Sequence, residues 1–216
     1  MPLSMRFDPL VARAEPDLPF RLGLFGGTFD PVHRGHLHIA ACACEQFSLD
    51  GVLFMPAGRP VGKAGPVRAS AKDRLAMLRA AVAGEAHFDV SSLELEREGP
   101  TYTVDTLRAV RARYGARVRL FLIVGLDVAA ELDTWRDAPE IADAVTVLSA
   151  KRAITADLER RLRHNGRCFD IRPIESKLID VSSSGLRASV GRGCSIRHLV
   201  PDAVHAYIRE QGLYQG

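Results

Sequence analysis

The chain has 216 residues, enough for one compact domain, and its 47% hydrophobic and 25% charged residues are typical of a soluble globular protein. A formal net charge of +3 is weak for a nucleic-acid-binding protein, so we expect no nucleic-acid partner. Because no apolar run reaches membrane-spanning length, we expect no membrane association either.

Residues 1–20 contain four prolines and several acidic residues, and they lack the apolar core of a signal peptide. We interpret them as a flexible tail that precedes a single domain over residues 21–216. The four cysteines do not have the spacing of metal ligands. Cys42 and Cys44, two positions apart on a predicted helix, face different ways. Reduced structural thiols are therefore predicted, and with them a cytoplasmic location.

The rest of the chain alternates apolar strands with helices. Strands are predicted at 22–25, 51–56, 87–90, 118–124, 144–148 and 168–171, and helices at 37–42, 71–83, 103–114, 127–132, 138–143, 155–165, 184–190 and 201–210. This alternation predicts an α/β fold, a Rossmann-like doubly wound parallel sheet with helices on both faces and a small helical part at the C-terminus. In such a sheet, ligands bind outside the carboxyl ends of the strands.

The stretch from Gly26 to His36 joins the first predicted strand to the first helix. Its two glycines let the main chain come close to a ligand, and free N–H groups at a helix start can hold a phosphate. His33 and His36 are three positions apart, so both imidazoles can lie on one helix face. The dinucleotide fingerprint Gly-x-Gly-x-x-Gly is absent after this strand, which argues against a dehydrogenase.

A second informative stretch runs from Val181 to Arg187. Ser182, Ser183 and Ser184 precede a predicted helix, and Arg187 lies one turn inside it. Hydroxyls that cap a helix, together with a nearby guanidinium, can bind an anion. The same residues also suit an ordinary helix cap beside a solvated arginine, and the pattern by itself leaves both interpretations open.

Gly27, Phe29, Pro31, His33, Gly35 and His36 together resemble the Gly-x-Phe-x-Pro-x-His-x-Gly-His signature of the nucleotidyltransferase superfamily, and residues 181–187 are similar to its Ile-Ser-Ser-Thr-x-Ile-Arg motif. Residues 94–107 resemble the Gly-Pro-Ser-Tyr-Thr-x-x-Thr-Leu stretch of bacterial nicotinate-mononucleotide adenylyltransferases, with Thr101 in place of serine. The resemblance to these adenylyltransferases extends to residues 73–78, 124–127, 204–214 and Trp135. It therefore runs from about residue 22 to residue 214. One loop departs from it: Pro60-Val61-Gly62-Lys63 stands where the family usually has Pro-Pro-His-Lys.

The resemblance implies transfer of AMP from ATP to nicotinate mononucleotide in NAD biosynthesis, with Mg²⁺ accompanying ATP and no metal ligand assigned in the chain. It implies His33, His36 and Arg187 as catalytic residues. The ATP-binding residues that it implies are Gly26, Gly27, Thr28, Phe29, His33, His36, Gly125, Asp127, Ser182, Ser183, Ser184 and Arg187. For nicotinate mononucleotide it implies Lys63, Tyr102, Thr103 and Trp135. A homo-oligomer is left open.

Three alternatives compete with this hypothesis. A related enzyme of the same fold could use nicotinamide mononucleotide or phosphopantetheine. A noncatalytic nucleotide sensor would be expected to lack His36 or Arg187, and this chain has both. A metal-dependent hydrolase could use His33 and His36 as ligands, with Asp30 as the sequence-local third. The transferase hypothesis requires the two imidazoles and Arg187 to converge on one triphosphate.

Overall fold

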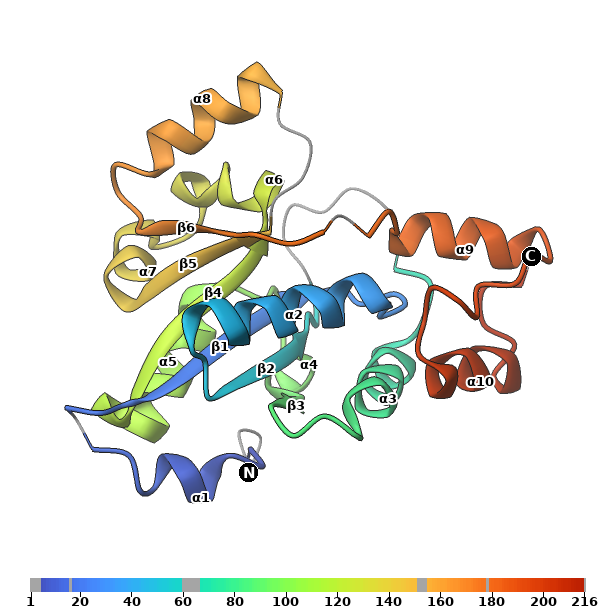
Figure 1. The fold of residues 1–216 in the computed structure, drawn as a ribbon, viewed down its shortest axis with the longest axis horizontal. Helices are drawn as coiled ribbons and strands as arrows, with labels where there is room; N and C mark the ends of the chain where they lie inside the picture. The colour runs from blue at the N-terminus through green and yellow to red at the C-terminus, as the bar shows by residue number, and fades with distance from the viewer. Residues whose placement is uncertain (1–4, 16, 60–66, 151–154, 178, 216) are drawn as a thin grey trace.

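The computed structural model describes residues 5–15, 17–59, 67–150, 155–177 and 179–215. Its strands are β1 (Phe20–Gly27), β2 (Gly51–Pro56), β3 (Phe88–Val90), β4 (Val118–Gly125), β5 (Val145–Ala150) and β6 (Ile171–Ile174). They form one parallel sheet in the order β3-β2-β1-β4-β5-β6 (Figure 1). This is the strand order of a doubly wound Rossmann-type sheet, so the predicted fold class is confirmed.

Helices connect the strands and follow the sheet. They are α1 (Asp8–Val11), α2 (Arg34–Phe47), α3 (Ala71–Val82), α4 (Leu93–Glu96), α5 (Thr103–Tyr114), α6 (Leu126–Ala129), α7 (Ala138–Ala144), α8 (Ala156–Asn165), α9 (Ser183–Gly191) and α10 (Asp202–Glu210), with 3-10 turns η1 (Gly115–Arg117) and η2 (Leu132–Thr134). Within the described ranges, none of these helices has the length and apolar character needed to span a bilayer.

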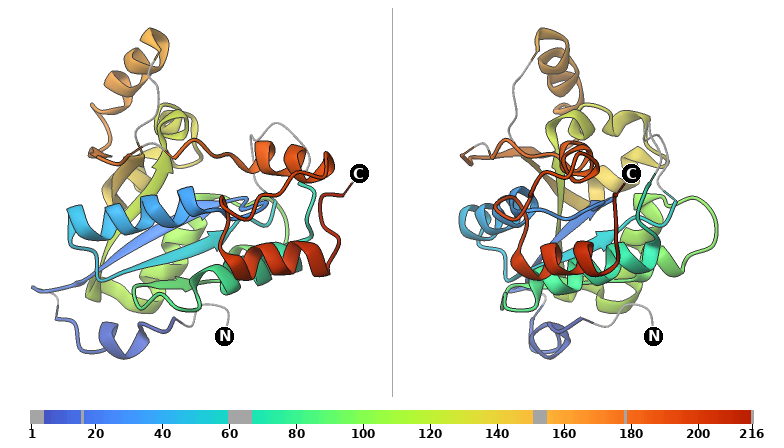
Figure 2. Two further views of the ribbon diagram at one scale, coloured as in Figure 1. Left: turned by 45° about the vertical axis from the view of Figure 1, so that its right-hand side comes forward. Right: turned by 90° about the vertical axis from the view of Figure 1, so that its right-hand side faces the viewer.

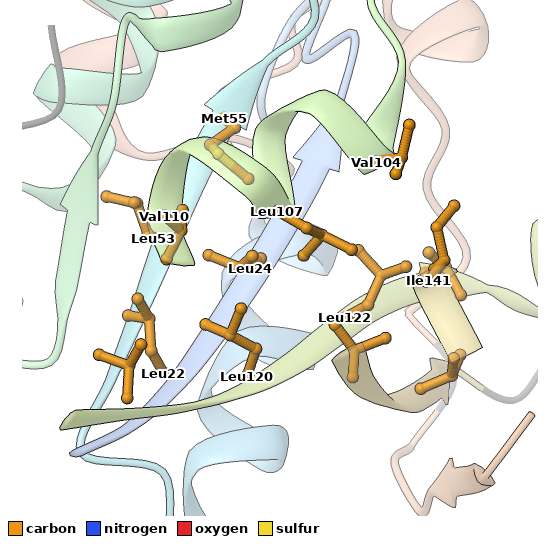
Figure 3. Packing of buried hydrophobic residues seen from close by; sticks show 14 of the residues in the cluster. Leu22, Leu24, Leu53, Met55, Val104, Leu107, Val110, Leu120, Leu122 and Ile141 are labelled. Carbon is orange, nitrogen blue, oxygen red and sulfur yellow. The ribbon is translucent and has the colours of Figure 1, made fainter. Parts of the chain in front are cut away.

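Both faces of the sheet are buried. Successive side chains of the central strands are apolar and point to opposite faces. In β1, Leu22 and Leu24 belong to one core cluster and Phe25 to the other. On the first face, Leu107 and Val110 of α5 pack over these leucines (Figure 3). Strands covered on both faces show continuous apolar runs, which is why β1, β2 and β4 could be recognised in the sequence.

Helices cover the sheet on both sides, as predicted. Residues of α4, α5 and α7 contribute to the first core cluster, whereas α2, α3, α9 and α10 contribute to the second. The C-terminal helices α9 and α10 form the small helical part, and α10 lies alongside α3 (Figures 1 and 2). The end of the chain is thereby brought close to the turn that follows β1.

The expectation of a flexible N-terminal tail is corrected for residues 5–15. Met5, Phe7 and Val11 are buried in the first core cluster, and the N–H of Arg6 donates to Asp89 at 2.6 Å. The Phe7 ring occupies the space next to Gly51, where an added Cβ would lie 2.6 Å from it. Apolar side chains scattered among prolines and acidic residues therefore anchor this segment to the sheet.

The last strand was predicted at 168–171 and lies three residues later, in β6. The N–H groups of Cys168 and Phe169 both donate to the carbonyl of Asn165, which continues a turn after α8. Phe169 is buried from this turn, so its apolar character does not indicate a strand. Pro173 is tolerated within β6 because β6 pairs with β5 alone and is an edge strand.

Candidate active site

Two of the predicted ligand-binding segments, residues 26–36 and residues 125–127, lie at the topological switch point of the sheet. The order of the strands reverses between β1 and β4, which are direct neighbours. The stretch from Gly26 to His36 runs from the end of β1 into the first turn of α2. Gly125 ends β4, and Asp127 lies in the first turn of α6. Ligands of open α/β sheets bind at this position.

His33 and His36 lie together at the start of α2. His33 is the N-cap residue, with an extended backbone, and its N–H donates to Nδ1 of His36 at 3.2 Å. The two rings are stacked, with 3.7 Å between their centroids and 21° between their planes. Since Nδ1 of His36 accepts this hydrogen bond, a neutral His36 ring carries its proton on Nε2.

The Phe29 side chain packs against His36. Its side chain is 2% exposed, and its ring meets the His36 ring edge-on at 5.0 Å between centroids. The φ angle of Phe29 is 51°, in the left-handed region that a bulky residue rarely adopts. Because the side chain is packed inside the second core cluster, any contact of Phe29 with a nucleotide would be made by its backbone.

The segment 181–187 packs directly against the histidine turn. Nη1 of Arg187 donates to the carbonyl of Asp30 at 2.7 Å, and Oγ of Ser183 donates to the carbonyl of Pro31 at 2.9 Å. An added Cβ on Gly35 would lie 2.8 Å from the Val181 side chain, so only glycine permits this close packing. The segment that carries Arg187 is therefore fixed to the same turn that leads into His33 and His36.

The three serines that precede and open α9 have different local roles. Oγ of Ser182 accepts from the N–H of Gly185 at 3.1 Å and is the N-cap of the helix. Ser183 ties the helix to Pro31, as described above. Ser184 is exposed, and its Oγ lies 3.3 Å from that of Ser182. Helix capping and an anion site, the two interpretations left open by the sequence, are therefore compatible here.

A second group of predicted residues lies at the start of α5. Tyr102 is the N-cap residue of α5, which begins at Thr103. Trp135 is partly buried against the first core cluster, and the guanidinium of the next residue, Arg136, lies 4.8 Å from the centroid of the Tyr102 ring. Tyr102 and Trp135 are therefore held in one neighbourhood. Lys63, predicted for the same substrate, lies outside the described residues.

Hydrogen bonds connect the two groups across the ends of β1 and β2. The N–H of Ala57 donates to the carbonyl of Gly27 at 2.8 Å. Two residues later, Arg59 and Thr101 exchange a pair of bonds: the N–H of Thr101 donates to the Arg59 carbonyl at 3.0 Å, and the N–H of Arg59 to Oγ1 of Thr101 at 3.2 Å. Thr101, which stands where the similar stretch has serine, therefore keeps a hydroxyl that accepts a hydrogen bond.

Sequence comparison places the chain in a known protein family. Residues 24–189 match the model of the cytidylyltransferase-like family. A relative from Synechococcus sp. (strain JA-3-3Ab), named "Probable nicotinate-nucleotide adenylyltransferase", is 41% identical over 196 residues, which cover 90% of this chain and 94% of the relative. A relative of the same name from Salinispora arenicola (strain CNS-205) is 38% identical over 190 residues, covering 88% and 99%. The chain belongs to the nicotinate-nucleotide adenylyltransferase family.

Solved structures with the same fold include members that carry nucleotides. The Plasmodium falciparum nicotinic acid mononucleotide adenylyltransferase complexed with NaAD has a TM-score of 0.68 at 15% identity, covering 90% of this chain and 97% of that one. The same protein complexed with APC has a TM-score of 0.66 at 14% identity, covering 90% and 96%. At these identities the likeness establishes the fold alone.

Arg74 joins two loops of the candidate site, although sequence analysis assigned it no function. It is 2% exposed, and its Nη1 donates to the carbonyls of Thr28 at 2.9 Å and Ala57 at 2.8 Å. It therefore joins the turn after β1 to the turn after β2. The available signal was its position on α3, where it lies on the same buried side as Met77 and Leu78.

Glu94 is a second residue that sequence analysis missed. It is buried, and Oγ1 of Thr106 donates to its carboxyl at 2.9 Å. Burial raises the pKa of Glu94 to about 7, although the bond from Thr106 and the charge of Arg97 act in the opposite direction. An added Cβ on Gly58 would clash with the carbonyl of Glu94, so the loop after β2 packs tightly on this residue.

The hypothesis of a metal-dependent hydrolase finds no third ligand at Asp30. Both carboxylate oxygens of Asp30 already accept hydrogen bonds, from the N–H groups of Arg68 and Ala69 and from the hydroxyl of Tyr214. In the described part of the chain, no group of three His, Cys, Asp or Glu residues is placed to hold a metal ion.

Two surface hollows, one beside α10 and one between α1 and α5, are lined by none of the predicted site residues.

Proposed function

We propose that the protein transfers the AMP moiety of ATP to nicotinate mononucleotide, forming nicotinate adenine dinucleotide and releasing pyrophosphate. The observation that carries this proposal is the convergence of the stacked pair His33 and His36 with Arg187 on the turn after β1. Membership in the nicotinate-nucleotide adenylyltransferase family supports the two substrates.

The reaction needs alignment more than acid–base chemistry. The nucleophile is a phosphate oxygen of the mononucleotide, and a phosphate monoester has a second pKa of about 6, so it is largely deprotonated at neutral pH. It attacks the α-phosphorus of ATP, and the bond to the β-phosphate oxygen breaks. The protein has to align these atoms and stabilise the charge that develops on pyrophosphate.

In the proposed ATP site, the backbone of Gly26, Gly27 and Thr28 approaches the triphosphate, and His36 donates to it from Nε2. His33, 5% exposed and stacked on His36, holds that ring in place and adds a second donor group. Arg187 and the exposed hydroxyl of Ser184 bind the outgoing phosphates. Gly125 and Asp127, at the start of α6, contact the ribose of the adenylate.

In the proposed mononucleotide site, the Trp135 ring stacks on the pyridine and the N–H groups at the start of α5, near Tyr102 and Thr103, receive the carboxylate. Helix N-termini favour anions, so this placement prefers nicotinate to its amide. The guanidinium of Arg136 lies over the Tyr102 ring in the same neighbourhood, where Asp105 and Asp137 partly offset its charge. We propose that Lys63 also contributes positive charge to the binding of the mononucleotide.

Mg²⁺ fits this site as a companion of ATP. Magnesium commonly keeps several waters and binds phosphate oxygens, neutralising charge as the phosphates separate, so it needs few protein ligands. The carboxylate of Asp30, on the same turn as the histidines, is engaged in three hydrogen bonds and is not offered to a cation. We also propose a cytoplasmic location, which the four unpaired cysteines support.

The test supplies purified protein with ATP, Mg²⁺ and one acceptor at a time, and follows pyrophosphate release. We expect rapid release with nicotinate mononucleotide and slower release with nicotinamide mononucleotide. Equal or faster release with the amide would overturn the substrate assignment. Release with phosphopantetheine alone would identify a different nucleotidyltransferase, and ATP binding without release on any acceptor would indicate a nucleotide sensor.

A further inference from the structure

The carboxylate of Asp30 is the point where the site and the C-terminus of the chain meet. Asp30 is 2% exposed. Its Oδ1 accepts from the Tyr214 hydroxyl at 2.7 Å and from the N–H of Ala69 at 3.1 Å, and its Oδ2 accepts from the N–H of Arg68 at 2.7 Å. Each of these donors is electrically neutral, although the carboxylate that they surround is buried.

Arg187 lies close to this carboxylate without forming a tight ion pair with it. Its Nη1 is 3.9 Å from Oδ2 of Asp30 and donates to the Asp30 backbone carbonyl at 2.7 Å. A guanidinium and a buried carboxylate attract each other strongly at this range. The neutral donors around Asp30 satisfy the carboxylate by other means, so the remaining N–H groups of Arg187 stay available for phosphates.

Tyr214 reaches Asp30 because the chain reverses direction after α10. The N–H of Leu213 donates to the carbonyl of Ile208 at 3.0 Å, and both Gly212 and Tyr214 have left-handed φ angles, of 59° and 65°. Burial, and then the hydrogen bond to Asp30, raise the pKa of the Tyr214 phenol, so its hydroxyl stays protonated as a donor at neutral pH. The view in Figure 2 places this end of the chain beside α9.

We infer that Tyr214 is a positioning residue for the proposed reaction: its hydroxyl saturates Asp30 and thereby keeps Arg187 directed toward the outgoing pyrophosphate. This inference rests on the proposed function. Without the hydroxyl, Oδ1 of Asp30 loses its shortest hydrogen bond, and the guanidinium of Arg187 moves closer to the carboxylate to replace it. The cation is then held by Asp30 at the expense of the phosphates.

The test compares Tyr214→Phe with a matched control, Tyr207→Phe. The Tyr207 hydroxyl donates to Asp73 at 2.9 Å, a bond of the same kind from the same part of the chain, but to a carboxylate on α3. We expect Tyr214→Phe to lower kcat and pyrophosphate affinity by about tenfold, the usual scale of a lost hydrogen bond to a charged group, and to leave the KM for nicotinate mononucleotide unchanged. Tyr207→Phe should match the wild type in all three measurements.

A double variant separates positioning from general support of the fold. In an Arg187→Ala background, adding Tyr214→Phe should reduce kcat no further, because the residue through which Tyr214 acts is gone. A full additional tenfold loss in that background, or a Tyr214→Phe protein that equals the wild type, would overturn the inference. So would equal losses in Tyr214→Phe and Tyr207→Phe.

Calorimetric titration with inorganic pyrophosphate gives a readout that does not depend on turnover. Asp30→Asn combined with Tyr214→Phe removes the charge that captures Arg187, so this protein should bind pyrophosphate more tightly than Tyr214→Phe alone. If it binds no better, the capture of Arg187 by Asp30 is refuted. A wild-type protein that binds pyrophosphate but transfers AMP to no acceptor would defeat the proposed function, whereas the order of these affinities would still test the role of Tyr214.

Discussion

The backbone N–H of His33 donates to Nδ1 of His36, and the two imidazoles stack 3.7 Å apart. This bond fixes both the ring orientation and the tautomer of His36, so that its Nε2 carries the proton. In the proposed reaction His36 donates from this Nε2, and Phe29 packs edge-on against the same ring.

Replacing His36 with alanine should lower kcat by about 10²–10³-fold, the usual loss when one donor to a developing oxyanion is removed. The fold should persist, because His36 is a partly exposed residue of α2. His38→Ala is the matched control: this histidine lies half a turn along the same helix, near Cys42, and should leave kcat unchanged. Steady-state pyrophosphate release and circular dichroism measure both effects, and near-normal turnover of His36→Ala would refute its role.

Replacing Gly35 with alanine should impair both stability and activity. The new Cβ would meet Val181 at 2.8 Å, and overpacking of this kind costs about 1–3 kcal/mol in the free energy of unfolding. It would also displace the segment that carries Arg187. The control is Gly84→Ala, where an added Cβ has no heavy atom within 4 Å. Urea unfolding together with kcat would decide, and equal behaviour of the two variants would contradict the packing argument.

Trp135→Ala should mainly weaken binding of the mononucleotide. The proposed stacking surface for the pyridine is lost, while the histidines and Arg187 are untouched, so KM for nicotinate mononucleotide should rise by about tenfold with a smaller change in the KM for ATP. Initial-rate measurements with each substrate varied in turn separate the two constants. An unchanged KM for the mononucleotide would count against stacking.

The buried carboxyl of Glu94 should make stability depend on pH. Its pKa in the folded protein is about 7, above the ordinary value of 4.5, so the folded state binds the extra proton between these values. Unfolding free energy should therefore fall as pH rises from about 4.5 through 7, by about 1–3 kcal/mol from this group. Glu94→Gln, which mimics the protonated form, should gain stability relative to the wild type between pH 5 and pH 8. Thermal unfolding at both pH values measures this, and parallel changes in the two proteins would show that Glu94 is not the source.

The parallel sheet could be predicted because its central strands are buried on both faces and therefore appear as continuous apolar runs such as 118–124. The boundaries of α5 followed from helical periodicity and the glycine at its end, and α9 extends one residue beyond the predicted 184–190 at each end. The N-terminal segment could not be placed, since Met5 and Phe7 are isolated apolar residues whose docking partners, such as Gly51, are distant in sequence. The predicted position of β6 was wrong because an apolar residue buried from a turn, such as Phe169, cannot be told in the sequence from one buried in a strand.

The site was predictable where the chemistry is local. The histidine turn and the 181–187 segment each have a pattern of their own, although nothing in either stretch states that Gly35 lets them pack together. Arg74, Glu94 and Tyr214 escaped assignment because their partners are carbonyls, a threonine and an aspartate brought near by folding. Single side chains with long-range partners leave no periodic signal in a sequence.

The central claim is that His36 and Arg187 act on a single triphosphate. A crystal structure with a nonhydrolysable ATP analogue and Mg²⁺ tests it most directly. We predict that Nε2 of His36 and the guanidinium of Arg187 both lie within hydrogen-bonding distance of oxygens of that one triphosphate. A triphosphate bound elsewhere on the sheet, or contacted by only one of these two side chains, would contradict the account.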